Sequence, residues 1–506
     1  METVSKRQCD IEHQAVSENS KPSTLIDGNE TDTNSNDHLA YEVVWSKDDP
    51  ENPKNWSALH KCLAIFTMGY GATVVSLFST SYTVGITGLQ EEFHISKTVG
   101  LLGLTTYLIG MAVGSMILAP LSEMYGRRPI YIFSITLFTI FVLPSALATN
   151  IQTILITRFF TAFFGSAMMS NSPGSVNDIV SEKHRAFAFG FWSLGPTNGP
   201  VIGPIIGGFI FEYLGWRWLD WIIMILGGVA FLLVLTIKET YAPFLLRKRA
   251  LRMRKETGNP KWWSRYDNQL DFATYLQINI TRPLTMMVTE PICIFWNGYV
   301  ALVYGVLYLC FVAYPLAFQK YRGWTPGIGG LAYLGIGCGS VLTIAFEPIL
   351  RKIINSHKKD ATGKVPPEAM VSVICVSAVL LAAGEIWFAW TSTPNVHWIV
   401  PILAGVPFGA GNAGVFIYMS NYLVQSYNDY AASALAGNAV LRSIFGALLP
   451  LAGPSMYATL GLHWAGFLLG MVEAVCVAIP VVFYLYGYRI RERSVMIRKM
   501  QADRAL

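Results

Sequence analysis

Residues 195–208 read GPTNGPVIGPIIGG, and this stretch decides how the rest of the sequence is interpreted. Glycine recurs at four-residue intervals, and a proline follows each of the first three glycines. On a helix this spacing gathers the glycines into a smooth strip, against which a neighbouring helix backbone can pack closely. Each proline removes an intrahelical hydrogen bond and bends the helix. The residues around the motif, 186–210, are mostly apolar, so the stretch indicates a membrane helix with a specialised packing face.

Similar apolar runs continue on both sides of this motif. Of the 506 residues, 53% are hydrophobic and only 14% are charged, against about 25% charged in an ordinary soluble domain. This excludes a soluble globular protein and a disordered chain. A membrane-crossing helix needs about 20 mostly apolar residues, and twelve stretches satisfy this: 62–83, 98–118, 129–149, 152–173, 186–210, 216–237, 293–318, 326–348, 369–391, 397–422, 432–457 and 464–487. The sequence therefore predicts an all-α membrane protein with twelve transmembrane helices in two six-helix halves.

Polar segments divide the chain and predict its orientation. We expect a disordered tail at 1–60, a first half at 61–237, a central loop at 238–292, a second half at 293–487 and a C-terminal tail at 488–506. With the N-terminus inside, the inner loops and C-terminal tail hold 25 Lys and Arg residues, and the outer loops hold four. Because cytoplasmic loops are enriched in basic residues, both termini are expected in the cytoplasm, with the protein in the plasma membrane.

The central loop carries a basic cluster, RKRALRMRK, at 247–255. On an interfacial helix such a cluster can hold anionic membrane lipid. The alternative is a solvated linker whose charge only retains the loop on the cytoplasmic side, and we favour it because the positive-inside bias must act here in any case.

The loop between the second and third predicted spans, APLSEMYGRRP at 119–129, combines charges of both signs. Glu123 is expected to pair with Arg127 and Arg128 around Gly126. A carboxylate held by guanidinium groups can latch neighbouring helices in one conformation. The alternative is an exposed turn whose ion pair is worth less than about 1 kcal/mol.

Ionisable residues inside predicted spans are costly, so each is a candidate functional group. Arg158 in the fourth span needs a cavity or a counter-ion, and we interpret it as functional. For Glu385 and Glu473, in the ninth and twelfth spans, proton coupling and a structural polar pair are equally open. Arg442 in the eleventh span is interpreted as an inner structural clamp. Three other acidic residues lie nearer span ends and could simply reach water: Asp178, Asp220 and Glu347.

Polar and aromatic residues within the spans could line a wide amphipathic cavity, although any single one could equally serve packing. The candidates are Tyr70, Thr73, Asn171, Asn297, Tyr304, Tyr308, Asn412, Tyr418 and Asn421.

Motifs for other chemistries are missing from the sequence. The Gly363-Lys364 pair lacks the preceding glycine and the following Ser or Thr of a Walker A loop, which excludes ATP-driven transport by this chain. The histidines show no metal-ligand or catalytic-triad spacing with Cys or Asp. No cofactor, metal, nucleic-acid partner or enzymatic activity is therefore expected.

Together these features resemble the major facilitator superfamily and, more narrowly, the fungal twelve-span drug:proton antiporters. The resemblance covers about residues 48–490 and is carried by five stretches: DPENPKNWS, APLSEMYGRRP, SLGPTNGPVIGPIIGGFI, KETYAPFLLRKRA and AGNAVLRSIFGALLPLAGPSMY. The chain departs from the common pattern at Ala119, where the loop motif often begins with Gly, and at Met124, where Arg is frequent. Val312 stands where relatives that handle polyamines have Glu, so a polyamine substrate is not expected.

The resemblance also implies roles for individual residues. Glu123, Gly126, Arg127 and Arg128 match the inner gating loop, and Arg158 matches an arginine associated with proton coupling. The motif that distinguishes antiporters from uptake carriers is matched by Gly195, Pro196, Gly199, Pro200, Gly203, Pro204, Gly207 and Gly208.

The function implied is proton-coupled export of small amphipathic organic compounds by a monomer that alternates its access between the two sides of the membrane. The expected partners are the small-molecule substrate, protons and membrane lipid. Proton-coupled uptake of a nutrient, and a non-transporting membrane sensor on the same scaffold, are the alternatives.

Overall fold

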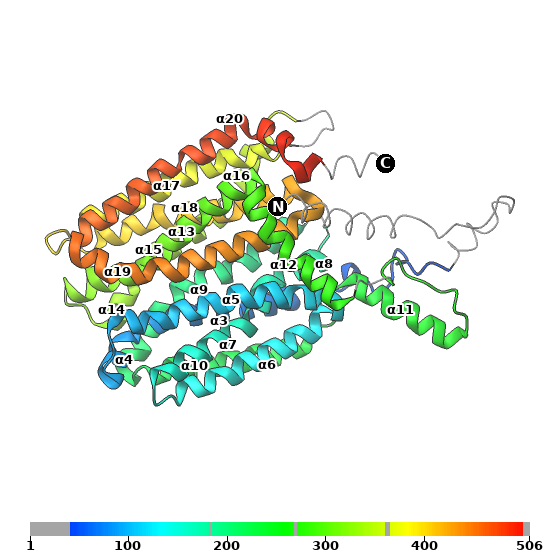
Figure 1. Cartoon of the computed structure of the whole chain (residues 1–506), viewed down its shortest axis with the longest axis horizontal. Helices are drawn as coiled ribbons and strands as arrows, with labels where there is room; N and C mark the ends of the chain where they lie inside the picture. The colour runs from blue at the N-terminus through cyan, green and yellow to red at the C-terminus, as the bar shows by residue number, and fades with distance from the viewer. Residues whose placement is uncertain (1–40, 182–183, 268–270, 360–364, 499–506) are drawn as a thin grey trace.

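The computed structural model describes residues 41–181, 184–267, 271–359 and 365–498. Long helices run side by side along the molecule (Figure 1), and the only pairing of extended backbone among these residues is one isolated parallel bridge between Glu42 and Trp263. The structure is therefore a helical bundle, as the composition predicts.

The first half contains six long helices and two short ones. They are α3 (Ala58–Val84), α4 (Ile86–Phe93), α5 (Lys97–Tyr125), α6 (Arg127–Ala146), α7 (Ile151–Ser170), α8 (Ser172–Ile179), α9 (Arg185–Leu214) and α10 (Arg217–Thr236). Local sequence sets several of these boundaries. Ser96 and Asn150 accept hydrogen bonds from the backbone N–H groups of Val99 and Thr153, which caps the starts of α5 and α7.

The connecting segment and the second half follow. The connection contains α11 (Ala242–Thr257) and α12 (Phe272–Thr289), and a short turn, η1 (Pro53–Asn55), precedes α3. The second half comprises α13 (Pro291–Tyr314), η3 (Pro315–Lys320), α14 (Pro326–Leu331), α15 (Leu334–Ala345), α16 (Glu347–Asn355), α17 (Glu368–Thr391), α18 (Ile399–Tyr427), η4 (Asn428–Tyr430), α19 (Ala431–Cys476) and α20 (Ala478–Arg493).

Within the described residues, ten helical ranges are long and apolar enough to cross a membrane. One of them, Ala431–Arg493, holds 63 residues and turns at Gly461, where φ is +74°. Figure 1 shows this range run the length of the bundle and return beside α17. Helix α9 adds a further 30-residue helix to the bundle. Beyond these ten ranges, the full count of twelve crossings stays a prediction.

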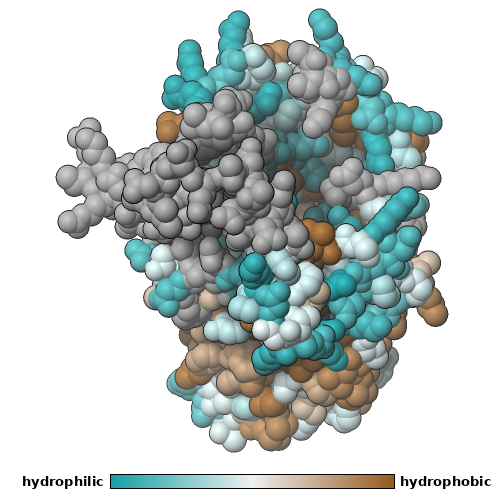
Figure 2. Space-filling view, turned by 90° about the vertical axis from the view of Figure 1, so that its right-hand side faces the viewer, coloured by the Kyte–Doolittle hydropathy of each residue, from teal (hydrophilic) through white to brown (hydrophobic). Residues whose placement is uncertain are grey.

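The two ends of the bundle differ. Helices α8, α11 and α12 and the first and last described residues gather at one end, which we call the α11 end, whereas α4 and α14 lie at the opposite α4 end (Figure 1). Figure 2 looks onto the α11 end and shows a hollow bordered by hydrophilic side chains.

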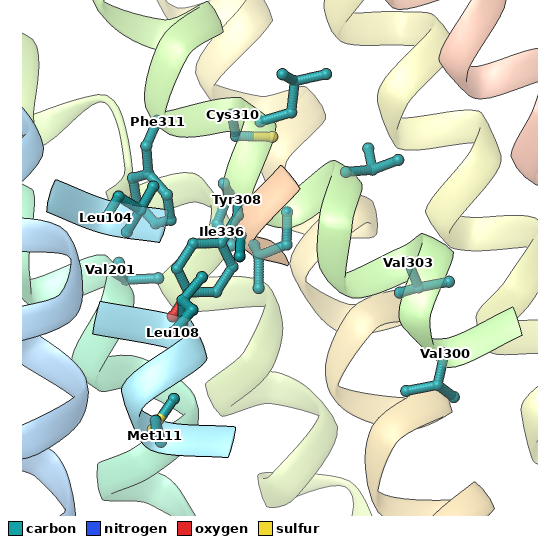
Figure 3. Packing of buried hydrophobic residues seen from close by; sticks show 14 of the residues in the cluster. Leu104, Leu108, Met111, Val201, Val300, Val303, Tyr308, Cys310, Phe311 and Ile336 are labelled. Atoms are coloured by element: carbon teal, nitrogen blue, oxygen red, sulfur yellow. The ribbon is translucent and has the colours of Figure 1, made fainter. Parts of the chain in front are cut away.

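The halves meet through a shared apolar core. Figure 3 shows Leu104 and Leu108 of α5 and Val201 of α9 near Phe311 of α13 and Ile336 of α15, and all five belong to one buried cluster. Lipid tails are as apolar as these side chains, so the contact is stabilised mainly by close van der Waals packing.

The segment that precedes α3 corrects one expectation. Residues 41–57 were predicted to belong to a disordered tail, but they pack along the connecting segment. Val43 donates its backbone N–H to Trp263 O, and Asp49 forms an ion pair with Arg249 of α11. Acidic and aromatic residues in this segment find basic and aromatic partners that lie about 200 residues away, which no local pattern reveals. Residues 1–40 lie outside the described residues.

Candidate transport site

The glycine strip of α9 lies directly against α3. A methyl group at Gly199 would lie 2.6 Å from Ser76 Cβ, and one at Gly203 would lie 2.3 Å from Thr80 Oγ1 and 2.8 Å from Leu77 O. Real Cβ atoms are almost never found so close to other atoms. Only glycine permits this approach, so the close helix packing that the four-residue spacing predicts is present.

The same helix reaches the second half at the α4 end. A methyl group at Gly208 would lie 2.4 Å from Pro326 O of α14. A methyl group at Gly330 of α14 would likewise lie 2.5 Å from Pro204 O of α9. Beside them, Glu212 accepts a hydrogen bond of 2.9 Å from the backbone N–H of Gly327. Tight backbone packing and a charge-assisted hydrogen bond therefore close the α4 end between the halves.

Three further hydrogen bonds join the halves within the bundle. The Ser79 hydroxyl of α3 lies 3.0 Å from the Tyr308 hydroxyl of α13. Thr105 of α5 donates to Ala447 O of α19 at 2.8 Å, and Ser340 of α15 donates to Asn198 Oδ1 of α9 at 2.7 Å. Each pair must separate if the halves move apart.

The predicted gating loop forms a tight corner between α5 and α6. Gly126 has φ of +94°, a conformation that side-chain-bearing residues rarely adopt. The Glu239 carboxylate accepts the backbone N–H groups of Arg127 and Arg128 at 3.0 Å each, and it also accepts that of Tyr241. A carboxylate at these free N–H groups caps the start of α6 and complements its dipole.

The side chains of the loop choose partners that differ from those expected. Glu123 forms no ion pair with Arg127 or Arg128 among the described residues. Instead, Arg127 Nε donates to Asp178 of α8 at 2.9 Å, and Glu123 accepts a 2.6 Å hydrogen bond from Tyr275 of α12. The reason is geometric, because α5 ends at Tyr125, the chain turns at Gly126, and the side chains of Glu123 and Arg127 extend towards different helices.

Tyr275 is well suited to donate to this carboxylate. Burial and the nearby Glu123 charge raise the pKa of the Tyr275 hydroxyl well above its usual range, so it keeps its proton. Helix α12 leads into α13 and packs against α19, so the Glu123–Tyr275 hydrogen bond links the first half to the second at the α11 end.

Arg158 is fully buried at membrane depth, but it lacks the cavity or direct counter-ion that the sequence suggests. Its guanidinium donates to Gly103 O at 2.8 Å and to Phe78 O at 3.2 Å. The rings of Phe78, Tyr82 and Tyr107 surround it, the closest centroid being 4.0 Å away at Tyr82. Backbone carbonyls and aromatic faces compensate the charge here.

Neither Glu385 nor Glu473 forms an ion pair with Arg158. The acidic neighbour whose charge acts on Arg158 is Asp220 of α10, which is buried and accepts a 2.9 Å hydrogen bond from Ser145. From its place near the start of a span Asp220 could simply have reached water, and nothing local shows that α10 packs against α6 and α3.

Glu385 and Glu473 come together in the second half. Glu385 lies at the interface between α17 and the second arm of α19, where a methyl group at Gly466 would lie 3.7 Å from its carboxylate. Glu473 lies two turns after Gly466 on α19 and is close enough to interact with the charge of Glu385. Both carboxylate oxygens of Glu473 lack hydrogen-bond partners among the described residues. Two buried carboxyls so placed cannot both be charged at low cost.

The predicted cavity residues take different positions. Asn171 is buried, and its backbone oxygen accepts from Arg127, so it belongs to the gating loop. Tyr70 is half-buried and donates to Leu226 O at 3.3 Å. Tyr418 is buried on α18, while Asn421 near the α11 end of that helix is half-buried. Thr73 donates to Gly69 O within its own helix.

The other polar candidates cluster around Arg442. Asn297 of α13 accepts a 3.2 Å hydrogen bond from Asn438 of α19, one turn before Arg442. The Arg442 guanidinium lies between two rings, 4.8 Å from the Tyr304 centroid and 4.7 Å from that of Phe416. This arrangement faces the first half, because Tyr304 bonds to Tyr308, which contacts Ser79.

The fold and these positions can now be compared with known proteins. The sequence profile of the Major Facilitator Superfamily matches residues 62–450. The chain is 39% identical over 477 residues to the MFS-type efflux pump MFS2 of Trichophyton rubrum, covering 92% of this chain and 80% of that protein. The chain belongs to the Major Facilitator Superfamily. A second member, the multidrug transporter mdrA of Aspergillus fumigatus, is 39% identical over 466 residues, with 91% and 77% covered.

A solved major facilitator structure shares the architecture. The proton:xylose symporter XylE of E. coli aligns with a TM-score of 0.61 over 86% of this chain and 96% of its own, at 15% identity. Such low identity shows the fold alone. Members of the superfamily are transporters, so this major facilitator is a multi-pass membrane transporter and not an enzyme.

Three of the six basic residues in the 247–255 cluster of this major facilitator form ion pairs within the described part of the chain. On α11, Arg249 and Arg252 pair with Asp49 and Glu51 of the segment before α3, and Arg254 pairs with Asp267. The Arg249 guanidinium holds the pKa of the Asp49 carboxyl below its usual value. These pairs favour the solvated-linker interpretation over a dedicated lipid site.

Four residues that organise the site had no partner assigned from the sequence: Asp178, Asp220, Glu239 and Tyr275. Asp178 and Asp220 carried a signal, since both are acidic residues close to spans. Glu239 lies within the KETYAP stretch that supports the family resemblance, but nothing local shows that it caps α6. Tyr275 has no signal, because its role depends on where α12 docks.

Proposed function

We propose that this transporter exports small amphipathic organic compounds from the cytoplasm and is driven by proton entry. The observation that carries the proposal is the α9 glycine strip, seated on α3 along one side and on α14 at the α4 end. Such a strip lets the halves seal against each other without bulky side chains, and two relatives at 39% identity are named an efflux pump and a multidrug transporter.

Alternating access would proceed by rocking of the two halves. The α4 end is sealed by α9 against α14 and by Glu212 bonding Gly327, whereas the α11 end has a hollow (Figure 2). We assign this conformation as open to the cytoplasm. On outward opening, the contacts at the α4 end break and the α11 end closes around the gating loop, with Arg127, Asp178 and Glu239 fixing the corner at Gly126.

Proton coupling requires buried groups that can exchange a proton as access changes. The candidates are Arg158 with its neighbour Asp220 in the first half, and Glu385 with Glu473 in the second. Arg158 cannot itself carry the proton, but it can favour the charged form of a carboxylate in one conformation. One inward proton yields about 2.3 kcal/mol per 100 mV, which supports roughly a fiftyfold gradient of a neutral substrate.

The orientation follows from the distribution of basic residues. We place the α11 end, with both termini, in the cytoplasm, and the monomeric protein in the plasma membrane. The Asn279-Ile280-Thr281 sequon lies on α12 at this end, so it should stay unglycosylated. A glycosidase-sensitive shift in mobility that disappears in Asn279→Gln would reverse the orientation.

The decisive test of the proposed function is proton movement in reconstituted vesicles. Purified full-length protein is loaded into vesicles with a pH-sensitive dye, and a panel of toxic amphipathic compounds is added in turn. An exporter moves protons opposite to the compound, whereas a symporter moves both in the same direction. Co-directional movement, or a nutrient as the sole transported compound, would replace this proposal with proton-coupled uptake.

A further inference from the structure

Arg442 is the starting point, because its guanidinium lacks what a buried cation normally has. It makes no hydrogen bond or ion pair with the described residues, and its Nε is buried without a partner. Its central carbon lies 4.8 Å from the Tyr304 ring centroid and 4.7 Å from that of Phe416. The N–H groups of a guanidinium point outwards in its plane, so aromatic faces leave them unsatisfied.

Two side-chain amides near Arg442 are also unsatisfied. Asn297 is fully buried, and its Nδ2 has no partner in the described part of the chain. It bonds to Asn438, one turn from Arg442 towards the α11 end. Asn412 Nδ2 is likewise unpartnered, one turn from Phe416 on the opposite side of Arg442. Unpaired donors on α13 and α18 therefore lie about one helical turn from the residues around Arg442.

The charge at this place is one-sided. Ionised groups closer to the α11 end have partners of their own. Glu347 and Arg351 pair with each other at 2.8 Å, Glu368 pairs with Arg491 at 3.0 Å, and Glu290 accepts hydrogen bonds from the Tyr427 hydroxyl and the Met496 N–H. Glu385 and Glu473 lie between α17 and the second arm of α19. Arg442 thus stays an uncompensated cation, and a guanidinium can only donate hydrogen bonds whichever way the amides are turned.

Arg442 and its neighbours keep partial exposure in the interior of the bundle. Arg442, Tyr304, Asn412 and Phe416 are all half-buried although each lies in the interior of a long helix. Tyr304 and Gly446, one turn after Arg442, contact each other where α5 of the first half approaches at Leu108. These residues therefore lie on the surface of the second half that faces the first half.

We infer that Arg442, with Asn297 and Asn412, forms a recognition site for an anionic group, so that the preferred substrates are amphipathic compounds bearing a carboxylate. A carboxylate would supply acceptors to the free guanidinium edge in a bidentate arrangement, while Tyr304 and Phe416 offer aromatic surface to the rest of the molecule. This inference rests on the proposed exporter function, since it names the substrate class at the same central site.

Binding should be measured separately from transport, so that the two proposals can fail independently. Purified full-length protein in lipid nanodiscs is tested by equilibrium binding with radiolabelled benzoate, 1-naphthoate and 9-anthroate at neutral pH. Each carboxylate has a matched neutral probe, the corresponding aryl methanol. The wild-type protein is expected to bind at least one carboxylate about tenfold or more tightly than its alcohol.

Variants then locate the preference. Arg442→Gln should weaken carboxylate binding by roughly tenfold to a hundredfold and leave alcohol binding within about threefold. Arg442→Lys should give an intermediate loss, because it keeps the charge and loses the planar fork. Asn412→Leu, which is close in size, should weaken carboxylate binding by about threefold to tenfold. The control is Arg489→Gln, since Arg489 also lies over a tyrosine ring, that of Tyr486, but is exposed on α20.

Three results would overturn the inference. The first is the absence of any carboxylate preference in the wild-type protein, including failure of all three carboxylates to bind. The second is retention of the full preference in Arg442→Gln. The third is an equal loss of carboxylate and alcohol binding in both Arg442→Gln and Arg442→Lys, which would make Arg442 a packing residue. A carboxylate preference without proton movement in vesicles would leave this inference standing and defeat the proposed proton coupling.

Discussion

Arg158 in the first half and Arg442 in the second both contact aromatic rings but differ in burial and in hydrogen bonding, since Arg158 is fully buried and Arg442 is half-buried. Both lie at membrane depth with aromatic rings against the guanidinium. Around Arg158, the backbone carbonyls of Gly103, Phe78 and Ser79 also accept hydrogen bonds, whereas no described atom accepts one from Arg442. The difference separates a cation that ties helices together from a cation left available to a ligand.

The comparison extends to the halves that carry these arginines. In the first half, several buried charges have fixed partners, such as Asp178 for Arg127 and the backbone N–H groups that Glu239 accepts, although Arg158 Nη1 is left without one. In the second half, neither oxygen of Glu473 has a partner among the described residues, and the site around Arg442 keeps unpaired donors. Buried polar atoms without partners are costly, so Glu473 and the donors around Arg442 mark candidate places for proton or ligand binding.

The largest expected effect comes from removing the side chain of each arginine in turn. Arg158→Ala should destabilise the protein by about 3 kcal/mol or more, because it orphans three carbonyls and empties a pocket, and it should abolish coupled export. Arg158→Lys should be intermediate, since lysine keeps the charge without the fork. Arg442→Ala should change stability by less than about 1 kcal/mol.

Thermal unfolding of the purified variants, followed by tryptophan fluorescence, measures this contrast alongside proton flux in vesicles. Equal stability losses at the two positions would break the comparison. Unchanged coupling in Arg158→Ala would show that this arginine only packs.

The next effect tests whether the first half depends on the glycine strip of α9. Gly203→Ala places a methyl group 2.3 Å from Thr80 Oγ1 and 2.8 Å from Leu77 O, so it should force α9 from α3 and reduce transport tenfold or more. Gly199→Leu should abolish transport while some folded protein still reaches the cell surface. Surface labelling distinguishes lost transport from lost protein.

A matched control lies on the same helix. A methyl group at Gly190 would meet nothing within 4 Å, so Gly190→Ala should transport like the wild-type protein. If Gly190→Ala and Gly203→Ala behave alike, helix propensity and not close packing explains the glycines.

A smaller effect concerns the link between the halves at the α11 end. Tyr275→Phe removes the hydroxyl that donates to Glu123 at 2.6 Å, and the lost hydrogen bond is worth about 1 to 2 kcal/mol. We expect a shift of roughly fivefold to thirtyfold in the equilibrium between inward-open and outward-open states, measured as distances between spin labels on the two halves. Tyr486→Phe, at an exposed position on α20, should leave those distances unchanged.

The smallest effect concerns the Asp49–Arg249 ion pair, which lies outside the membrane where water also stabilises charged groups. Because Arg249 lowers the pKa of Asp49, this pair stabilises the docking of residues 41–57 on α11 at and above the ordinary pKa of aspartate. The contribution is lost as pH falls through the lowered pKa, so docking is expected to be constant near neutral pH and to weaken only in strong acid. Limited proteolysis of the segment measures docking, and Asp49→Asn should raise cleavage at neutral pH while transport changes less than twofold. Release of the wild-type segment near pH 6 would contradict this assignment.

The sequence could predict features that depend on neighbouring residues. The apolar runs predicted ten helical ranges that the structure describes, and the four-residue glycine spacing predicted the close packing of α9. Arg158 was identified because a charge in an apolar run is conspicuous whatever its partners are.

The sequence could not predict which residues the charged side chains would contact. Glu123 was assigned to arginines four and five residues away, but it bonds to Tyr275, 152 residues further along the chain. Arg442 was read as a structural clamp, and only the tertiary structure shows that α13 and α18 supply aromatic faces without acceptors for its N–H groups.

The sequence by itself determined the membrane helices, the charge distribution between loops and the packing face of α9, because transfer into lipid and helix periodicity act over about twenty consecutive residues. Only the tertiary structure decided which buried charges are satisfied, because the carbonyls around Arg158 and the empty edge of Arg442 depend on how helices distant in sequence pack.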